Sequence, residues 1–168
     1  MDMPIVDLFF RWFHLIFALV WVGHNYASFI QHPGFRPFNP QTSEQARNAD
    51  MEQRMQREHG TFRYASIVVW CTGMGMLWYR GWLEGALSLS GSLAPIGVGA
   101  WIGTLMMLNL WLIMWPHQKK VLGFVAASDE ERVRCSRITF LASRTNTILS
   151  VPLLFFMAAG SHGINLWL

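Results

Sequence analysis

Charged residues are scarce in this sequence: Asp, Glu, Lys and Arg make up 14% of its 168 positions. A soluble domain carries roughly 25%. The shortage is concentrated in four stretches without any charged residue, at 12–35, 64–79, 85–118 and 145–168. A bilayer is crossed by about 20 apolar residues, a length the second stretch reaches if Arg63 and Arg80 snorkel to the interfaces. This absence excludes a soluble enzyme and a disordered chain, and it indicates a membrane protein.

Cysteine is also scarce, since only Cys71 and Cys135 are present. Cys71 lies within an apolar stretch and Cys135 in a basic region, so we expect no disulfide between them. The sequence is therefore not a disulfide scaffold. The first apolar stretch is too long for a secretory signal and ends without a small-x-small cleavage site, so we expect it to be retained as a span.

Basic residues are distributed unevenly along the chain. Eleven of the thirteen Lys and Arg residues lie in two segments, one after the first apolar stretch and one after the third. Cytoplasmic loops collect Lys and Arg, so both segments are predicted to be cytoplasmic and both termini periplasmic. The net charge of +3 therefore reflects topology. A nucleic-acid partner is not expected, because the sequence has no patch of aromatic and basic residues outside the predicted spans.

These features predict an all-α membrane protein in which residues 1–168 form one domain, a four-helix up-down-up-down bundle. We expect multi-pass insertion in the bacterial inner membrane. The predicted spans are about 6–30, 62–79, 95–115 and 145–168, and the predicted cytoplasmic loops are 31–61 and 116–144.

Local signals set the expected helix ends. The first span is expected to end at His32, Pro33 and Gly34. The third is expected to end at Pro116 and the Lys119–Lys120 pair. Ser128 and Glu131 have the spacing of a capping box, which begins a helix that can continue into the fourth span and kink at Pro152. A polar helix is expected at 43–58 in the first loop.

Histidine is the ionisable residue that the apolar stretches retain, and such residues are costly in a membrane unless they have a function. His14, His24 and His162 lie within predicted spans, and His59 and His117 lie at the cytoplasmic ends of spans. At about 1.5 Å per helical residue, His14 is about 12 Å and His162 about 9 Å from the periplasmic ends of their spans. These two share one layer, and the other three form a second layer near the cytoplasmic side.

Two histidines from different helices at one depth suit haem b, whose apolar ring fills a bundle interior while imidazoles bind the iron. We predict one haem between His14 and His162. A second haem, held by His24 with His59 or His117, is less strongly indicated because His14 and His24 differ by about 80° in facing on one helix.

The haem propionates need cations, for which Arg11 suits the first layer and Arg63 or Arg144 the second. Other interpretations remain open. A zinc site would need more ligands, often thiolates, and a single histidine in a span often only hydrogen-bonds to a neighbouring helix. Metal transport is a weaker alternative, for which the candidate residues are Met76, Met106, Met107 and Met114.

Three segments carry a family resemblance. They are Arg11-Trp-Phe-His14 with Trp21-Val-Gly23, then Asn109-Leu-Trp111 with Trp115-Pro-His-Gln-Lys-Lys120, and last Ser143-Arg144-Thr-Asn-Thr147 with Ser150-Val-Pro152 and Ser161-His162. Together, and in this order, they resemble the membrane-bound urate hydroxylases, the urate oxidase N-terminal domain family.

The resemblance implies a haem-binding bundle in which His14 and His162 match the family, and it adds Trp21 to the predicted cofactor-binding residues. The chain resembles a compact relative, because family members are larger and carry a cytochrome c domain, whereas no Cys-x-x-Cys-His motif is present here. Thr145 and His117 also stand where the family usually has histidine and asparagine. A weaker resemblance is to small four-span haem proteins that oxidise protoporphyrinogen.

The sequence therefore predicts a membrane-embedded b-type cytochrome that transfers electrons between a quinone or another donor and a periplasmic acceptor such as cytochrome c. One alternative is a haem-dependent oxidase of a urate-like purine or of a porphyrin precursor, so enzymatic activity stays open and no catalytic residue is assigned. Another is a non-catalytic subunit of a respiratory or photosynthetic complex. Gly99 and Gly103 favour close helix contact, which also permits a homo-oligomer.

Overall fold

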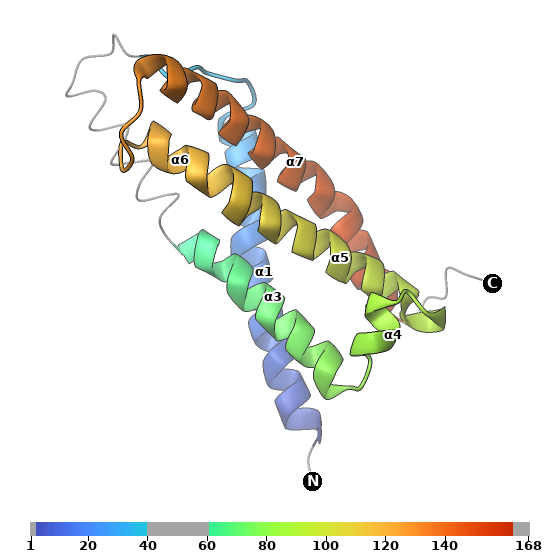
Figure 1. Cartoon of the computed structure of the whole chain (residues 1–168). Coiled ribbons are helices and arrows are strands. Elements are labelled where there is room, and N and C mark those ends of the chain that lie inside the picture. Colours follow the sequence, from blue (N-terminus) through green and yellow to red (C-terminus); the bar gives the residue numbers. More distant parts are fainter. Residues whose placement is uncertain (1–2, 40–60, 163–168) are drawn as a thin grey trace.

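The structure is a computed structural model that describes residues 3–39 and 61–162. These residues contain helices and no strand, which confirms the all-α prediction for this part of the chain. The elements are α1 (Met3–Gln31), α3 (Thr61–Tyr79), α4 (Leu83–Leu87), the 3-10 helix η1 (Gly91–Leu93), α5 (Ala94–Leu108), the π-helix η2 (Asn109–Met114), α6 (Trp115–Val121) and α7 (Asp129–Ser161) (Figure 1). The predicted polar helix at 43–58 lies outside the described residues.

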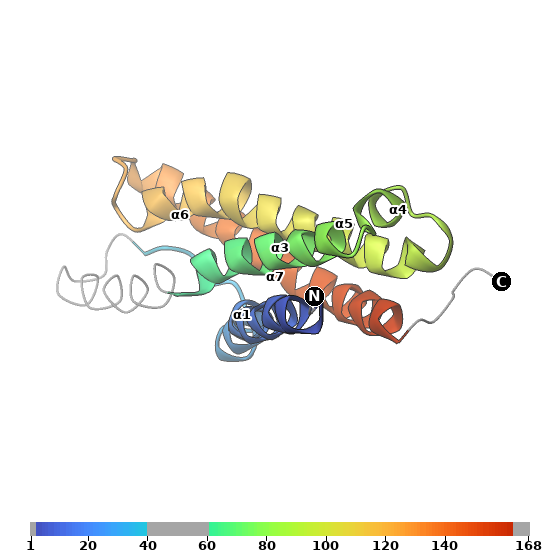
Figure 2. The ribbon, with the colours of Figure 1, turned by 90° about the horizontal axis from the view of Figure 1, so that it is seen from below.

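Two antiparallel helix pairs make up the bundle. In the first pair, α3 lies along α1: His24 near the end of α1 stacks on Phe62 at the start of α3. At the other end Asp7 pairs with Arg80, just after α3. In the second pair, α7 runs back along the continuous rod formed by α5, η2 and α6 (Figures 1 and 2). Both the first residues of α1 and the last of α7 lie at the end away from the α6–α7 connection (Figure 1).

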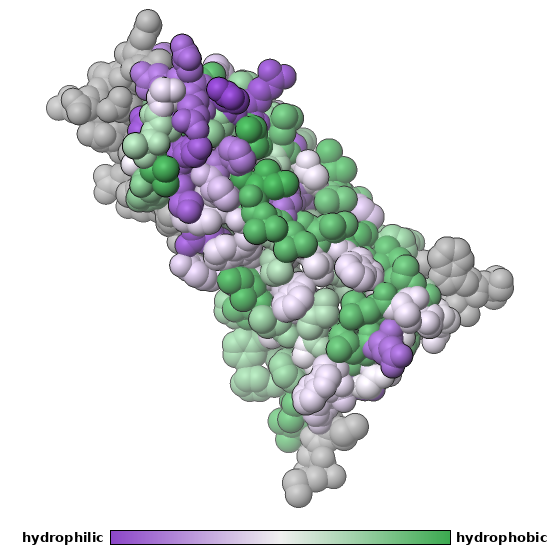
Figure 3. Space-filling view, in the orientation of Figure 1, coloured by the Kyte–Doolittle hydropathy of each residue, from purple (hydrophilic) through white to green (hydrophobic). Residues whose placement is uncertain are grey.

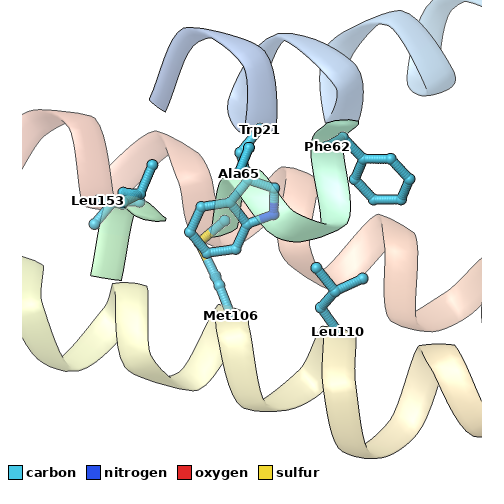
Figure 4. Packing of buried hydrophobic residues seen from close by; sticks show 7 residues of the cluster. Trp21, Phe62, Ala65, Met106, Leu110 and Leu153 are labelled. Atoms are coloured by element: carbon cyan, nitrogen blue, oxygen red, sulfur yellow. The ribbon is translucent and has the colours of Figure 1, made fainter. Parts of the chain in front are cut away.

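The core forms where the two pairs meet. It consists of Trp21, Phe62, Ala65, Val69, Met106, Leu110 and Leu153, contributed by α1, α3, α5, η2 and α7 (Figure 4). The Trp21 indole lies at the centre of this cluster and is 2% exposed. Between helices in a membrane such a cluster acts through close van der Waals packing, so it joins the two pairs by contact.

Three helical segments are long and apolar enough to cross a membrane: Ile5–Gln31, Gly91–Val121 and Asp129–Ser161. Large apolar side chains such as Leu8, Leu15 and Ile148 lie exposed along them, as expected for surfaces in contact with lipid. Hydrophilic side chains gather at the end with α6 and the start of α7, while much of the remaining visible surface is apolar (Figure 3). The structure thus indicates a membrane protein.

The second predicted span, 62–79, is present as the helix α3. α3 has 19 residues and includes Arg63 in its first turn, and it is not among the three segments that meet the requirements for crossing. Its helical bounds agree closely with the predicted range 62–79. The connection between the predicted spans 62–79 and 95–115 contains α4 and η1.

The predicted end of the third span at Pro116 is wrong. The helix continues through η2 and α6 to Val121. Proline removes one backbone donor and crowds the preceding turn, and here it is the second residue of α6, in the turn that follows the π-helical segment η2, where the backbone hydrogen-bond pattern changes. Much of the predicted loop 116–144 is therefore helical.

The helix predicted to begin after Ser128 is confirmed. The Ser128 hydroxyl accepts a hydrogen bond from the Glu131 backbone N–H at 3.2 Å, and α7 then runs for 33 residues through Pro152. The Glu131 carboxylate does not complete the capping box; it pairs with Lys120 at 2.5 Å. This ion pair links α6 to the first turn of α7.

Candidate functional site

His14 faces α3 from the middle of α1. Its Nδ1 lies 2.9 Å from the Val69 carbonyl oxygen and 3.3 Å from the Thr72 hydroxyl. Because a carbonyl can only accept, Nδ1 carries the proton and Nε2 has the free lone pair. A carbonyl bond at one ring nitrogen is the usual way in which a metal-binding histidine is oriented.

Gly73 makes this close approach of the His14 ring to α3 possible. A Cβ atom at Gly73 would lie 3.0 Å from the ring Cε1 and 3.3 Å from Nδ1. The Thr72 hydroxyl is itself directed to the Val68 carbonyl at 2.6 Å, so it offers His14 an acceptor. The local sequence of α3 therefore fixes both the position and the tautomer of the ring.

His162 belongs to the second helix pair, where it is the exposed residue directly after the last residue of α7. Its Nδ1 is 2.8 Å from the Ala158 carbonyl and 3.2 Å from the Ser161 hydroxyl. Hydrogen bonds between α1 and α7 include that between the hydroxyls of Tyr26 and Ser150, which are 3.2 Å apart. The hydrogen bonds of His14 are to α3 and those of His162 are within α7, and their pairing on one haem stays a prediction.

The two described histidines of the second predicted layer, His24 and His117, have different neighbours. The His24 ring stacks on Phe62 with centroids 3.8 Å apart, while His117 Nδ1 lies 2.6 Å from the Ile113 carbonyl of its own helix. His59 lies outside the described residues. Within residues 3–39 and 61–162, no group of three or more His, Cys, Asp and Glu side chains is arranged to hold a metal ion.

Arg11, one turn before His14, takes part in an ion-pair cluster. Asp7 accepts from Arg11 Nε at 2.8 Å and from both Nε and Nη2 of Arg80 at 2.7 Å. The Arg80 pair joins α1 to the end of α3, whereas the Arg11 pair lies within α1 and its Arg11 side chain is 57% exposed. Arg11 is therefore available to a further anion near His14.

These two arginines make a matched pair for a stability experiment. Replacing Arg80 by glutamine is expected to lower the free energy of unfolding by about 2 kcal/mol, because it removes two charge-assisted hydrogen bonds between helices. Replacing Arg11 by glutamine should cost about 0.5 kcal/mol or less, as for other exposed ion pairs. Thermal unfolding of both variants in one detergent measures the difference, and equal losses would contradict the assignment.

The two arginines predicted for the second layer are held by aromatic rings. Arg63 lies 3.9 Å from the Trp115 ring centroid. Arg144 lies 4.7 Å from Phe29 and from Phe140, and it donates to the His32 carbonyl. In each guanidinium Nε and Nη1 are buried without a hydrogen-bond partner. Both groups thus suit an anion such as a carboxylate.

Trp21, a predicted cofactor-binding residue, lies in the core. Its ring is part of the core and contacts neighbouring helices, and its Nε1 is buried without a partner (Figure 4). Its packing role is evident, and its contact with a cofactor stays a prediction.

A buried polar network between the rod and α7 was not predicted as a site. Asn109 Nδ2 donates to the Ala142 carbonyl at 2.9 Å and to Asn146 Oδ1 at 2.8 Å, and Asn146 Nδ2 donates to the Met106 carbonyl at 3.1 Å. Asn146 is fully buried, and Asn109 begins η2. Both residues belong to quoted family motifs, which was the signal in the sequence that could have identified them.

Comparison with known proteins supports the family resemblance that these motifs carry. The family model described as urate oxidase N-terminal matches residues 65–166, more than half of the chain and including η2 and α7. Neither the curated proteins nor the solved structures contain a match. The chain belongs to the urate oxidase N-terminal family.

Proposed function

We propose that this protein is a multi-pass b-type cytochrome of the bacterial inner membrane, in which His14 would bind the iron of haem b. It passes electrons from a quinone or another donor to a periplasmic acceptor such as cytochrome c. The observation that carries the proposal is the orientation of His14, whose Nδ1 is bonded to the Val69 carbonyl. That bond leaves Nε2 as the ligating atom.

The residues around His14 fit such a group. Haem b supplies one-electron redox chemistry when it is bound. The carbonyl of Val69 and the hydroxyl of Thr72 hold the imidazole, and the partly exposed Arg11 guanidinium is one turn away for a propionate. Phe13 and Phe17, whose rings stack on each other, are apolar neighbours of His14 on the same helix.

The membrane topology in the proposal has four spans and both termini in the periplasm. α3 accompanies α1 from the His24–Phe62 contact to the Asp7–Arg80 pair, so it crosses the bilayer where α1 crosses. Lys119 and Lys120 on α6 and Arg132 and Arg134 near the start of α7 lie at one end of the bundle, which is then cytoplasmic by the positive-inside rule.

We limit the proposal to one haem. His24 is stacked on Phe62 and His117 is bonded within its own helix, so the described residues of the second layer do not offer two converging imidazoles.

A second candidate function is haem-dependent oxidation of a urate-like purine. Two observations favour it: the family match and the position of His162, which lies at the exposed end of α7 and away from the His14 contact with α3. One imidazole without a second ligand would leave a coordination position for a small molecule, so carbon monoxide binding to the reduced protein separates this candidate from a six-coordinate cytochrome.

The test of the proposal is the optical spectrum of the full chain purified in detergent after expression with haem supply. We expect a Soret band and, after reduction, an α band. Protein that is folded by circular dichroism but shows neither band would overturn the proposal, and both haem candidates would then fail together.

A further inference from the structure

Arg63 carries a buried positive charge whose hydrogen bonding is incomplete. It lies in the first turn of α3 and is 7% exposed. One of its nitrogens, Nη2, donates to the Tyr64 hydroxyl at 2.9 Å, while Nε and Nη1 have no partner. A buried charge without acceptors is strongly destabilising, so an acceptor-rich partner is expected in the membrane.

The surroundings of Arg63 favour an anion. The Trp115, Tyr64 and Trp111 rings lie 3.9, 4.8 and 5.1 Å from the guanidinium carbon and fix its plane. Lys119 Nζ lies 5.8 Å from the same Trp115 ring and adds a second cation. The first turn of α3 contains no acidic residue, and a helix N-terminus attracts negative charge.

In the described part of the chain, no acidic side chain pairs with Arg63 or Lys119. Among residues 3–39 and 61–162, the ion pairs involve Asp7 and Glu131, and neither carboxylate pairs with Arg63 or Lys119. The charge is therefore to be balanced by a group from outside the described chain.

We propose that Arg63, Lys119 and the first turn of α3 bind the phosphate group of an anionic phospholipid. The site lies at the hydrophilic, basic end of the bundle (Figure 3), where clusters of basic side chains between helices bind lipid headgroups. Tyr64, which accepts the one satisfied Arg63 bond, is 54% exposed and leads from the guanidinium to the surface. Leu112 and Ile113, in the turn before Trp115, are exposed apolar side chains suited to acyl chains.

The inference does not rest on haem binding, and its experiment uses the full chain both with and without added haem. Protein in detergent is titrated with phosphatidylglycerol, with phosphatidylcholine, or with inorganic phosphate, and binding is measured by native mass spectrometry and by thermal shift. We expect phosphatidylglycerol to bind best. Its affinity should fall about tenfold in Arg63→Gln, the loss expected for charge-assisted hydrogen bonds.

Arg137→Gln is the matched control, because Arg137 is an exposed basic residue on α7 at the same end and its loss changes the net charge equally. It should bind phosphatidylglycerol as the wild type does. If Arg63→Gln does not fold, Lys119→Gln replaces it, since Lys119 lies outside the core, and a several-fold loss of affinity is expected.

Four results would overturn the proposal. The first is an unchanged affinity for phosphatidylglycerol in Arg63→Gln, or in Lys119→Gln where that variant replaces it. The others are binding of phosphatidylcholine as tight as that of phosphatidylglycerol, equal stabilisation by inorganic phosphate, and release of phosphatidylglycerol by added haem. The last would assign the anion at Arg63 to a haem propionate. The first three leave the haem proposal untouched, because they concern lipid affinity and not absorbance at the Soret band.

Discussion

Replacing His14 by alanine is expected to remove the haem absorbance of the purified protein, with haem affinity falling at least about 100-fold. Loss of an outer hydrogen-bond partner of a metal ligand already costs about 10–100-fold in affinity, and loss of the ligand itself should cost at least as much. The structure gives His14 this role because its Nδ1 is occupied by the Val69 carbonyl. Reduced-minus-oxidised spectra at equal protein concentration measure the effect.

Two further variants show whether the change is specific to His14. His117→Ala removes a histidine bonded only within α6 and η2, and it should retain the bands. Thr72→Val removes the hydroxyl 3.3 Å from Nδ1 but keeps the carbonyl bond, so haem affinity should fall by about tenfold or less. A His14→Ala protein that is folded and keeps the bands of the wild type would contradict the role of His14.

His162→Ala tests the predicted pairing of His14 and His162 on one haem. If His162 moves to the haem when the group is bound, its loss should convert a six-coordinate spectrum to a five-coordinate one that binds carbon monoxide. An unchanged spectrum would exclude His162 as a ligand and leave the His14 assignment in place.

Replacing Asn146 by leucine is expected to lower the free energy of unfolding by about 2–4 kcal/mol. Asn146 is fully buried, and its side chain joins Asn109 and the Met106 carbonyl. Each buried group left without a partner costs about 1–3 kcal/mol. Thermal or denaturant unfolding in detergent provides the measurement.

The adjacent Thr145 supplies the control for this second prediction. It is exposed on α7 and bonds only to the Leu141 carbonyl of its own helix, so Thr145→Val should change stability by less than about 0.5 kcal/mol. Asn109→Leu combined with Asn146→Leu should cost less than the sum of the single changes, because the two amides form one network. Additive losses would show that the network does not couple the rod to α7.

Some features of the fold followed directly from local chemistry. His32, Pro33 and Gly34 end α1, since proline and glycine do not continue a helix, and the Ser128 side chain caps α7 because its spacing to Glu131 suits the first turn. The absence of charge was enough to indicate a membrane protein, and the motifs around Asn109, Asn146 and His162 were enough to identify the family. The continuation of the helix past Pro116 was missed, because it depends on the π-helical turn before it.

The sequence by itself determined where helices begin, which segments suit a bilayer and which residue types are retained at a cost. Only the tertiary structure decided which side chains meet: His14 with Val69, Asn109 with Asn146, and Arg63 with Trp115. Lipid is as apolar as the core, so long helices of this kind are apolar on all sides and their composition does not reveal which face packs. The rotation and crossing of the helices set those contacts, and with them which polar atoms are buried without a partner.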